Sequence, residues 1–337
     1  MHPFSYSSVN DAAAAVREQA THSHSTFIAG GTNLLDLMKE NVARPAHLIG
    51  LNQLPLAFVE DTPEGGLRLG ALATNANTAY HPEVEKRYPL LSQAILSGAT
   101  AQLRNMATNG GNLMQRTRCY YFYDLTTPCN KREPGSGCSA LGGFNRIHAI
   151  LGASEQCIAT HPSDMCVALT ALDALVCVQG PQGERVLPFA DFHRLPGSTP
   201  HQDNNLKPGE LITALELPKQ GFAQHYHYLK IRDRASYAFA LVSIAAVLEL
   251  DGDTITEARV ALGGVAHKPW RERAAEELLI GQPTTEATFT KAASYLLRGA
   301  RGYGHNDFKI ELAKRGIVRA LQQAAAEPRG PRALPWA

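Results

Sequence analysis

The sequence has 337 residues, and 32 Lys and Arg residues against 31 Asp and Glu residues leave a formal net charge of +1. Hydrophobic residues make up 44% and charged residues 19%, which excludes a disordered chain, a collagen, a coiled coil and a disulfide-stapled mini-protein. The near-neutral total also argues against a nucleic-acid binder that relies on bulk positive charge.

The first part of the chain alternates between helical and strand patterns, as a small α/β unit does. Asn10 and Asp11 are suited to cap a helix, and Gly30-Gly31 ends the strand that follows it. A Pro-Glu-Gly-Gly turn at 63–66 indicates a hairpin. In chain order, the pattern predicts a helix at 12–19, a strand at 25–29, a helix at 34–40, a strand at 47–51 and the hairpin at 56–72.

The middle part contains a long polar insert between two helical patterns. After it come a connector rich in Pro, Gly and Asn at 195–205 and the turn Pro218-Lys-Gln-Gly221, where we place a domain boundary. The predicted elements are helices at 90–107 and 164–173, a hairpin at 174–188 and a strand at 211–217.

In the last part, strand patterns come before helical ones. This order predicts an α+β domain with its own core. The predicted elements are strands at 224–230, 238–250 and 257–263, followed by helices at 272–280, 285–298 and 307–325.

Two Gly-Gly turns are candidates for binding an anion. The first lies in Phe27-Ile-Ala-Gly-Gly-Thr-Asn-Leu-Leu35, where glycines allow close backbone approach and the start of the helix offers N–H groups to a pyrophosphate. The second lies in Arg104-Asn-Met-Ala-Thr-Asn-Gly-Gly-Asn112, among small polar side chains. Each turn alone could need glycine only for its shape, but two of them favour a shared dinucleotide. The fingerprint GxGxxG is absent, so a Rossmann NAD site is not indicated.

Four of the six cysteines fall between Cys119 and Cys157, in the pattern Cys119-x9-Cys129-x8-Cys138-x18-Cys157. Four thiolates can hold a [4Fe-4S] cluster, the two irons of a [2Fe-2S] cluster or one tetrahedral Zn²⁺ ion. The missing CxxC spacing argues against zinc, whereas two disulfides or free thiols stay open. The other two cysteines, Cys166 and Cys177, lie in apolar surroundings that predict core packing.

The cysteine window is also locally basic. Residues 101–150 contain six Lys and Arg residues and two acidic ones, a local charge of six minus two, or +4. Such cations could tune the potential of a cluster or dock an acidic electron carrier. A solvated loop face is the plain alternative.

Two single residues outside the turns are candidates for cofactor contact. Asp164 follows Ser163 at a helix start, which capping explains by itself, yet its carboxylate could accept hydrogen bonds from a ribose or a flavin ring. Lys230 follows an aromatic strand and could lie near N1 of a flavin, where a cation stabilises the reduced anion. Without further context, a structural role is favoured for both.

The first residues, Met1 to Tyr6, lack the basic and apolar regions of a signal peptide. The longest apolar run, Ala238 to Leu250, is shorter than the roughly 18 residues that span a bilayer. Taken alone, the sequence predicts a cytoplasmic chain without a membrane span, although a partner with a signal could export it.

The ordered set of motifs at 27–35, 104–112 and 162–164 resembles the FAD-binding subunit of the xanthine dehydrogenase, or molybdenum hydroxylase, family. Tyr228 to Arg234 and Ala261 to Ala266 resemble that family's C-terminal flavoprotein domain. The 49 residues 113–161, which carry the four clustered cysteines, resemble the insert of the [4Fe-4S]-bearing subunits. Such subunits occur in periplasmic aldehyde oxidoreductases and in 4-hydroxybenzoyl-CoA reductase, and the insert is more similar to the former.

The resemblance implies a site for FAD and a site for a cluster. The FAD pyrophosphate would be wrapped by Phe27, Ile28, Ala29, Gly30, Gly31, Thr32, Asn33, Leu34 and Leu35, with Ala107, Thr108, Gly111 and Asn112 on the opposite side. Asp164 would bind on the ribityl or ring side, Ile212 would pack on the flavin, and Lys230 would lie near the pyrimidine edge. The [4Fe-4S] cluster would be held by Cys119, Cys129, Cys138 and Cys157.

The implied fold is α+β, with an FAD-binding domain at 1–220 and a C-terminal flavoprotein domain at 221–330. The first domain would contain lobes at 1–55 and 56–220 and the insert at 113–161. The implied function is that of an oxidoreductase subunit that relays electrons and has no catalytic residues for the substrate.

The resemblance also implies partners and a compartment. A large subunit would carry the molybdenum cofactor, and a small subunit would carry two [2Fe-2S] clusters and the export signal for a periplasmic heterotrimer. The acceptor could be an acidic carrier such as a ferredoxin. The alternatives are the subunit of a cytoplasmic reductase, a self-contained flavin oxidase and a zinc-bound structural module.

Overall fold

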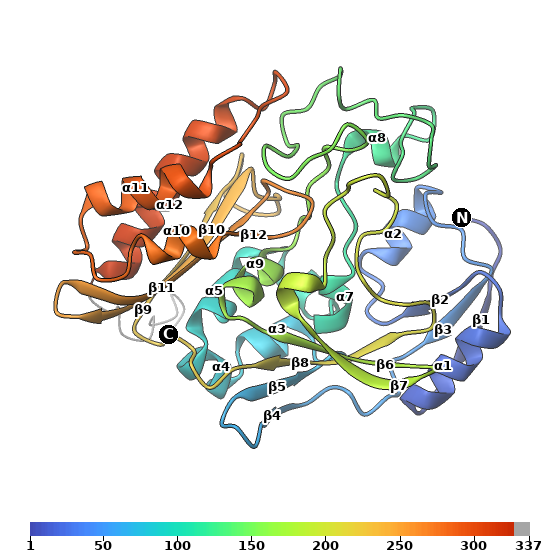
Figure 1. The fold of residues 1–337 in the computed structure, drawn as a ribbon. Coiled ribbons are helices and arrows are strands. Elements are labelled where there is room, and N and C mark those ends of the chain that lie inside the picture. Colours follow the sequence, from blue (N-terminus) through green and yellow to red (C-terminus); the bar gives the residue numbers. More distant parts are fainter. Residues whose placement is uncertain (327–337) are drawn as a thin grey trace.

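Three β-sheets organise residues 1–326, the part of the chain that the computed structural model describes. A parallel sheet has the strand order β1-β3-β2, and two antiparallel sheets have the orders β4-β5-β8-β6-β7 and β12-β11-β10-β9. Figure 1 shows the first sheet at one end of the molecule, the third at the other end and the second between them. Separate parallel and antiparallel sheets, each with its own helices, confirm the α+β class.

The N-terminal lobe contains the parallel sheet and two helices. Its elements are β1 (Ser5–Ser8), α1 (Ala12–Thr21), β2 (Ser25–Ile28), α2 (Leu34–Lys39) and β3 (His47–Gly50). Asp11 caps α1 by accepting a hydrogen bond from the amide of Ala14 at 2.7 Å. The sequence pattern missed β1, because its residues Ser-Tyr-Ser-Ser lack apolar alternation.

The middle sheet is made of two hairpins joined by β8. Its strands are β4 (Val59–Asp61), β5 (Leu67–Gly70), β6 (Leu175–Gly180), β7 (Gly183–Pro188) and β8 (Leu211–Leu217). The helical elements of this part are α3 (Asn75–Ala79), α4 (Pro82–Arg87), α5 (Pro89–Ser97), α6 (Ala101–Arg104), α7 (Asn109–Leu113), α8 (Tyr120–Tyr123), α9 (Asp164–Ala171) and η1 (Phe189–Asp191).

The single helix predicted at 90–107 is wrong, because the chain breaks into α5 and α6. Gly98 is extended and Ala99 has a φ of +50°, a left-handed conformation that ends a helix. Thr100 then caps α6 by accepting a hydrogen bond from the amide of Leu103. The sequence pattern did not reveal this break, because the residues on both sides of it are helix formers.

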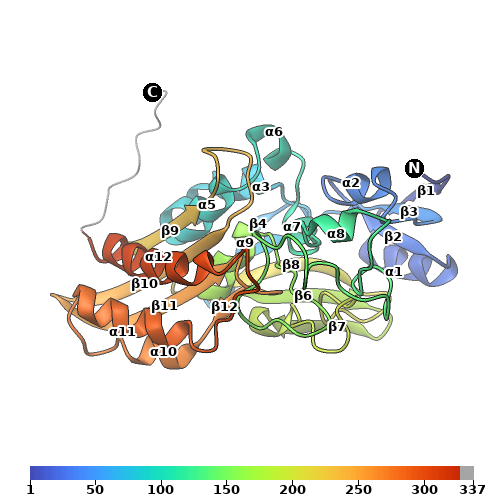
Figure 2. The ribbon, with the colours of Figure 1, turned by 90° about the horizontal axis from the view of Figure 1, so that it is seen from above.

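The C-terminal domain places an antiparallel sheet under three helices. Its elements are β9 (His225–Ile231), β10 (Val242–Asp251), β11 (Thr254–Gly263), β12 (Trp270–Arg271), α10 (Arg273–Glu277), α11 (Glu286–Leu296) and α12 (Phe308–Ala325). Figure 2 shows these helices together on one face of the sheet, with α5 and α9 toward the other.

Strand β10 is buried on both faces, which explains its almost uninterrupted apolar sequence. Ile244, Ala246 and Leu248 pack into the core under α11 and α12, whereas Ala245 and Val247 join the core of the middle sheet. The C-terminal domain is therefore fixed against the FAD-binding part through a shared core. Residues 327–330 of the domain predicted at 221–330 lie outside the described residues.

No helix within residues 1–326 is both long and apolar enough to cross a membrane.

Candidate functional site

A cleft of about 320 Å³ lies where the N-terminal lobe, the middle part and the C-terminal domain meet. Its walls come from the turn after β2, the segment from α6 to α7, the start of α9 and the loop between β9 and β10. The sequence-predicted residues that line it are Thr32, Asn33, Ala107, Gly111, Asn112, Asp164 and Lys230.

The two Gly-Gly turns meet at one wall of this cleft. A Cβ atom on Gly30 would lie 1.8 Å from the carbonyl oxygen of Met106, so only glycine allows the two loops to approach. Gly31 has a φ of +70°, which a side chain would strain. The fold thus brings the two turns together, and their shared dinucleotide ligand stays a prediction.

Helix caps and buried amides make the second turn rigid. Thr108 caps α7 by accepting a hydrogen bond from the amide of Gly111 at 3.2 Å. The side-chain nitrogen Nδ2 of Asn112 donates to the side-chain oxygen of Asn75 at 2.7 Å. The hydroxyl of Ser163 donates to the side-chain oxygen of Asn112. The cleft is therefore held by polar contacts within the protein.

Three donor atoms of the lining residues have no partner among the described residues. They are the side-chain nitrogen Nδ2 of Asn33 and the Nε atoms of Arg104 and Arg118, all buried. Leaving a buried donor unpaired costs about 1–3 kcal/mol, so these atoms fit a site completed by an anionic ligand. A diphosphate supplies acceptors of the required kind.

Asp164 and Lys230 form a buried ion pair at the floor of the cleft. The Nζ atom of Lys230 lies 2.7 Å from one carboxylate oxygen of Asp164, and the hydroxyl of Tyr228 donates to the other at 2.8 Å. Burial, together with the Asp164 charge, raises the pKa of Tyr228 well above its usual value. The structural and the cofactor-contacting interpretations of these two residues are compatible, since the pair lines the cleft and also joins α9 to β9.

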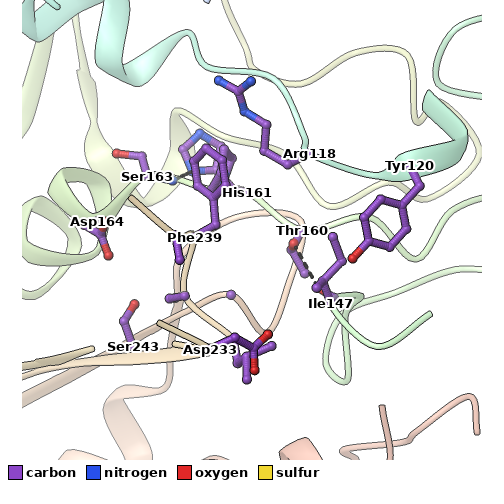
Figure 3. A pocket seen from close by; sticks show the side chains of 16 residues that line it. Arg118, Tyr120, Ile147, Thr160, His161, Ser163, Asp164, Asp233, Phe239 and Ser243 are labelled. Carbon is purple, nitrogen blue, oxygen red and sulfur yellow. Dashed lines mark hydrogen bonds between the residues drawn. The ribbon is translucent and has the colours of Figure 1, made fainter. Parts of the chain in front are cut away.

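A second cavity, of about 220 Å³, adjoins the cleft on the side of the insert. It shares Arg118, Asp164 and Phe239 with the cleft and adds Tyr120 and Asp233. Figure 3 shows Arg118 and Tyr120 on one side of this space, with Asp164 and Asp233 across from them. Since Tyr120 directly follows Cys119, the cavity lies between the cleft and the cysteine window.

The four clustered cysteines line one small pocket, with Cys129 and Cys138 paired as a β-bridge. All six cysteines of the chain are free thiols, and Cys166 and Cys177 are buried in the core as predicted. No three of the four sulfur atoms in the pocket lie within 4.8 Å of one another. The sulfurs of a tetrahedral zinc site would be about 3.8 Å apart, given a Zn–S bond of about 2.3 Å. The four thiols are therefore not arranged as a ready-made tetrahedral zinc site.

Burial disfavours the thiolate form of two of the four cysteines, Cys119 and Cys157. It raises the pKa of Cys119 to about 12 and that of Cys157 to about 11. Nε2 of His148 lies 3.1 Å from the sulfur of Cys119, and the amide of Ala159 donates to the sulfur of Cys157 at 3.4 Å. Such donors stabilise sulfur that carries negative charge, as metal-bound thiolates do.

Side chains of the insert hold the cysteine loops together. The side-chain oxygen of Asn130 accepts hydrogen bonds from the amides of Gly135 and Gly137, and its nitrogen donates to the carbonyl oxygen of Gln156. Asn130 thus connects the loops of Cys129, Cys138 and Cys157.

The six cations of residues 101–150 all have partners within the chain. Lys131 and Arg116 pair with Asp203, and together they hold the pKa of that buried carboxyl well below its usual range, against the opposing effect of desolvation. The others are Arg104 on backbone carbonyls of residues 96 and 98, Arg118 on Asp36, Arg132 on carbonyls of its own loop, and Arg146 on Asp233. The local +4 therefore holds the insert in place and does not form a free basic patch.

The remaining predicted FAD residues support the wall without lining the cleft. Phe27 and Ile28 end β2, Ala29, Gly30 and Gly31 form the turn, and Leu34 and Leu35 start α2, while Thr108 is the cap of α7. Ile212 is 5% exposed in β8 and belongs to the core of the middle sheet, so its contact with the flavin stays a prediction.

The sequence reasoning missed several residues that line the cleft. Arg104 and Arg118 were counted only among the positive charges of residues 101–150. Asp36, Tyr237 and Phe239 were not considered. The position of Arg118 directly before Cys119 was an available signal. Phe239 had none, because only the fold brings the loop after β9 to the guanidinium of Arg118, 4.9 Å from the ring centre.

Comparison with known families agrees with this architecture. Residues 2–220 match the FAD binding domain in molybdopterin dehydrogenase, and residues 225–324 match the CO dehydrogenase flavoprotein C-terminal domain. The chain therefore belongs to the family of FAD-binding subunits of molybdopterin dehydrogenases, and it is an oxidoreductase subunit.

Individual proteins of known name show how similar the chain is to members of this family. The chain is 51% identical to the aldehyde oxidoreductase FAD-binding subunit PaoB of Escherichia coli over 97% of its own length and 100% of that protein. It is 25% identical to the carbon monoxide dehydrogenase medium chain of Hydrogenophaga pseudoflava, covering 90% of each. The solved quinoline 2-oxidoreductase of Pseudomonas putida 86 superimposes with a TM-score of 0.74 at 25% identity, covering 96% of this chain and 97% of that one.

Proposed function

We propose that the chain is the electron-transfer subunit, carrying FAD and a [4Fe-4S] cluster, of a heterotrimeric molybdenum-dependent aldehyde oxidoreductase. The 51% identity to the PaoB subunit over nearly the whole chain supports the assignment to aldehyde oxidation. The bound groups would supply one- and two-electron chemistry, and the protein would supply their positions and surroundings.

The cleft supports FAD as the first group. The turn at Gly30-Gly31 leads into the start of α2, where backbone N–H groups would face a pyrophosphate. At the start of α7 the amides of Gly110 and Gly111 are already bonded to Ala71 and Thr108, so that turn would contribute its shape and side chains. Lys230 is held by Asp164 and by the carbonyl oxygen of Ser97, which fixes a cation at the floor of the cleft. Arg118 and Asn33 have unpaired donors that a diphosphate would satisfy.

The observation that carries the second group is the convergence of Cys119, Cys129, Cys138 and Cys157 on one pocket. Four cysteine thiolates are the usual ligands of a [4Fe-4S] cluster. The pocket adjoins Arg118 and Tyr120, which also line the cavities next to the cleft, so the two groups would be neighbours.

The proposed partner subunits are those of a molybdenum-dependent aldehyde oxidoreductase. A large subunit would carry the molybdenum cofactor and oxidise the aldehyde, and a small [2Fe-2S] subunit would carry its electrons to this chain. We place the complex in the periplasm, exported through a signal on the small subunit. An acidic carrier such as a ferredoxin stays the proposed acceptor, although the paired cations of the insert mean that it would dock elsewhere than on a free basic patch.

Activity measurements on the separated and the assembled protein test this function. The isolated chain with bound FAD should not oxidise aldehydes, whereas the complex with both partner subunits should reduce an artificial acceptor when given an aldehyde. Turnover of aldehydes by the isolated chain would support a self-contained flavin oxidase and contradict the relay. A complex that reduces aromatic acyl-CoA thioesters and leaves aldehydes unchanged would favour the reductase alternative.

A further inference from the structure

Three metal-ligating side chains lie together in the N-terminal lobe, outside both sites described above. They are Glu18 and His22 at the end of α1 and His47 at the start of β3, and one ligand atom of each lies within 4.8 Å of the others. Figure 1 shows α1 beside the edge of the parallel sheet, away from the cysteine insert. Nothing in the proposed electron relay uses these residues.

The backbone brings the three side chains together from two elements. Glu18 and His22 are four residues apart at the end of α1, so they lie on the same face of the helix. His47 is buried, and its Nε2 atom lies 3.3 Å from the carboxylate oxygen of Glu18. The rings of His22 and His47 stack at 4.1 Å with an angle of 11° between their planes.

The ring nitrogens of both histidines have hydrogen-bond partners that a bound ion would in part replace. Nδ1 of His22 lies 3.2 Å from the carbonyl oxygen of Glu18, and Nε2 of His47 lies 3.3 Å from the Glu18 carboxylate and 2.9 Å from the hydroxyl of Ser7. An ion bound at Nε2 of His47 would displace the proton shared with Glu18, as metal binding to histidine does. Nδ1 of His47 lies 2.7 Å from the hydroxyl of Ser5, a contact of the kind that orients metal-bound histidines.

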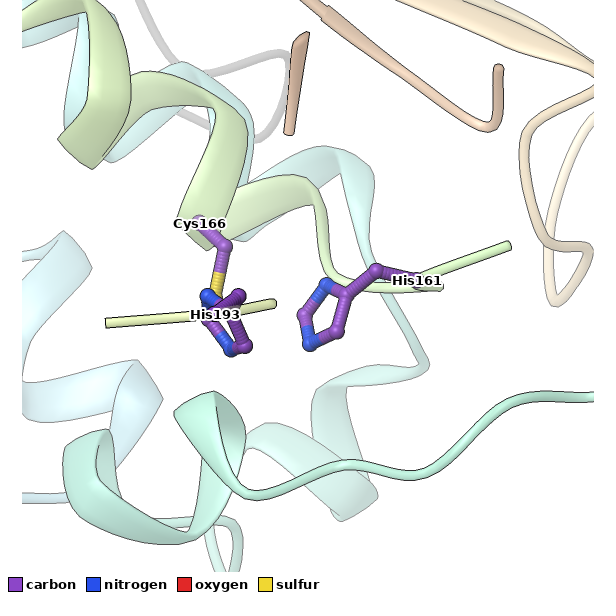
Figure 4. A group of neighbouring side chains, drawn as sticks. All are labelled: His161, Cys166 and His193. Atoms are coloured by element: carbon purple, nitrogen blue, oxygen red, sulfur yellow. The ribbon is translucent and has the colours of Figure 1, made fainter. Parts of the chain in front are cut away.

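A second group of similar composition differs in its access to solvent. Figure 4 shows His161, Cys166 and His193 close together in the interior. All three residues are buried, whereas His22 is exposed and offers an ion a way in.

We propose that Glu18, His22 and His47 form a binding site for a borderline divalent cation, Zn²⁺ above all. Two imidazole nitrogens and one carboxylate oxygen are a donor set that Zn²⁺ takes with water in the fourth position. The exposed ring of His22 would tilt so that its lone pair meets that of His47, and the ion would replace the hydrogen bond between His47 and Ser7. The bound ion would join α1 to β3 in the lobe that supplies the turn at Gly30-Gly31.

Calorimetric titration of the cluster-loaded chain with Zn²⁺ tests the proposal, since loading keeps the free cysteines from binding the ion. We expect one site, weakened at least about 10-fold in His22→Gln and in Glu18→Gln. His24→Asn is the matched control, because it removes an exposed imidazole two residues away, where φ is +56° and Asn is tolerated, and it should bind as the parent does.

The location is tested by anomalous scattering at the zinc edge from crystals soaked in Zn²⁺. A peak within coordination distance of all three side chains is expected. A parent chain that does not bind Zn²⁺, or a His22→Gln chain that binds it as tightly as the parent, would overturn the proposal, as would a peak at any other group of side chains only.

Discussion

The FAD cleft and the four-cysteine pocket share the short segment from Arg116 to Cys119, yet the chain builds them in different ways. The cleft is formed by strand ends and capped helices, and its ion pair and amide network are satisfied within the protein. The pocket is formed by loops around the four-residue helix α8, with thiols whose charged form is disfavoured by burial. The comparison teaches that the cleft should exist before its ligand arrives, whereas the pocket depends on its ligand for a favourable state.

The largest expected effect comes from removing one ligand of the pocket. Cys129→Ser should abolish the iron–sulfur signal of the chain and leave FAD bound, because the cleft has its own supports. Iron content and EPR measure the loss of the cluster, and flavin absorbance measures whether FAD stays bound.

Cys166→Ala is the control for this change, since it removes an equally buried thiol from the core and should keep both groups. Loss of FAD together with the cluster in Cys129→Ser would mean that the pocket holds the cleft in shape, for example through Arg118 and Asp36.

A substitution in the cleft tests whether FAD binding can be weakened while the cluster is kept. In Gly30→Ala the new Cβ would meet the backbone oxygen of Met106, a neighbour that cannot rotate away. An overpacking cost of about 1–3 kcal/mol predicts FAD binding that is about 10- to 100-fold weaker, with the cluster signal unchanged. Flavin titration of the apo-flavin chain measures it, and Gly142→Ala, whose Cβ would meet nothing within 4 Å, should match the parent.

The ion pair of the cleft should matter for stability as well. Lys230→Met leaves Asp164 buried without its cation, which is expected to lower the free energy of unfolding by about 3–5 kcal/mol. Denaturant unfolding measures the change. Arg315→Met breaks the exposed pair with Glu311 and should cost less than about 0.5 kcal/mol; equal effects of the two changes would show that the buried pair is not a support of the cleft.

A smaller effect should appear where the insert meets the C-terminal domain. Lys309 donates to the carbonyl oxygens of His148 and Gly264, and burial lowers its pKa to about 7. Between pH 7 and the unfolded value near 10.4 the unfolded chain binds more protons, so this residue makes stability rise with pH by up to about 1.4 kcal/mol per unit.

Lys309→Met should remove that slope, and the difference between the two chains in denaturant unfolding from pH 7 to pH 9 measures it. The exposed Lys291→Met is the control and should keep the slope of the parent. Parallel pH curves for Lys309→Met and the parent would contradict the lowered pKa.

Local signals allowed much of the molecule to be predicted from its sequence. The cap at Asp11, the turn at Gly30-Gly31, the start of α9 at Ser163 and the core positions of Cys166 and Cys177 follow from short-range chemistry. The left-handed backbone conformation of Ala99, which separates α5 from α6, depends on the packing around it. Alanine rarely adopts this conformation, so no signal for it was present in the sequence.

The parts of the site that depend on distant segments could not be predicted. Asp203 neutralises two cations of the insert, Lys131 and Arg116, from 72 and 87 residues farther along the chain. Phe239 reaches Arg118 from another domain. Such pairs are set by the arrangement of the three sheets. For that reason the basic stretch looked like a docking surface in the sequence and is an internal support in the fold.

EPR of the dithionite-reduced chain, with iron and acid-labile sulfide counted per FAD, tests the central claim most directly. The account predicts about four iron and four sulfide per FAD and the signal of a reduced [4Fe-4S] cluster. A chain with bound FAD but without iron, acid-labile sulfide or an EPR signal would contradict it, because the four cysteines would then hold no cluster. Zinc content alone does not decide, since Glu18, His22 and His47 are proposed to bind one Zn²⁺ ion.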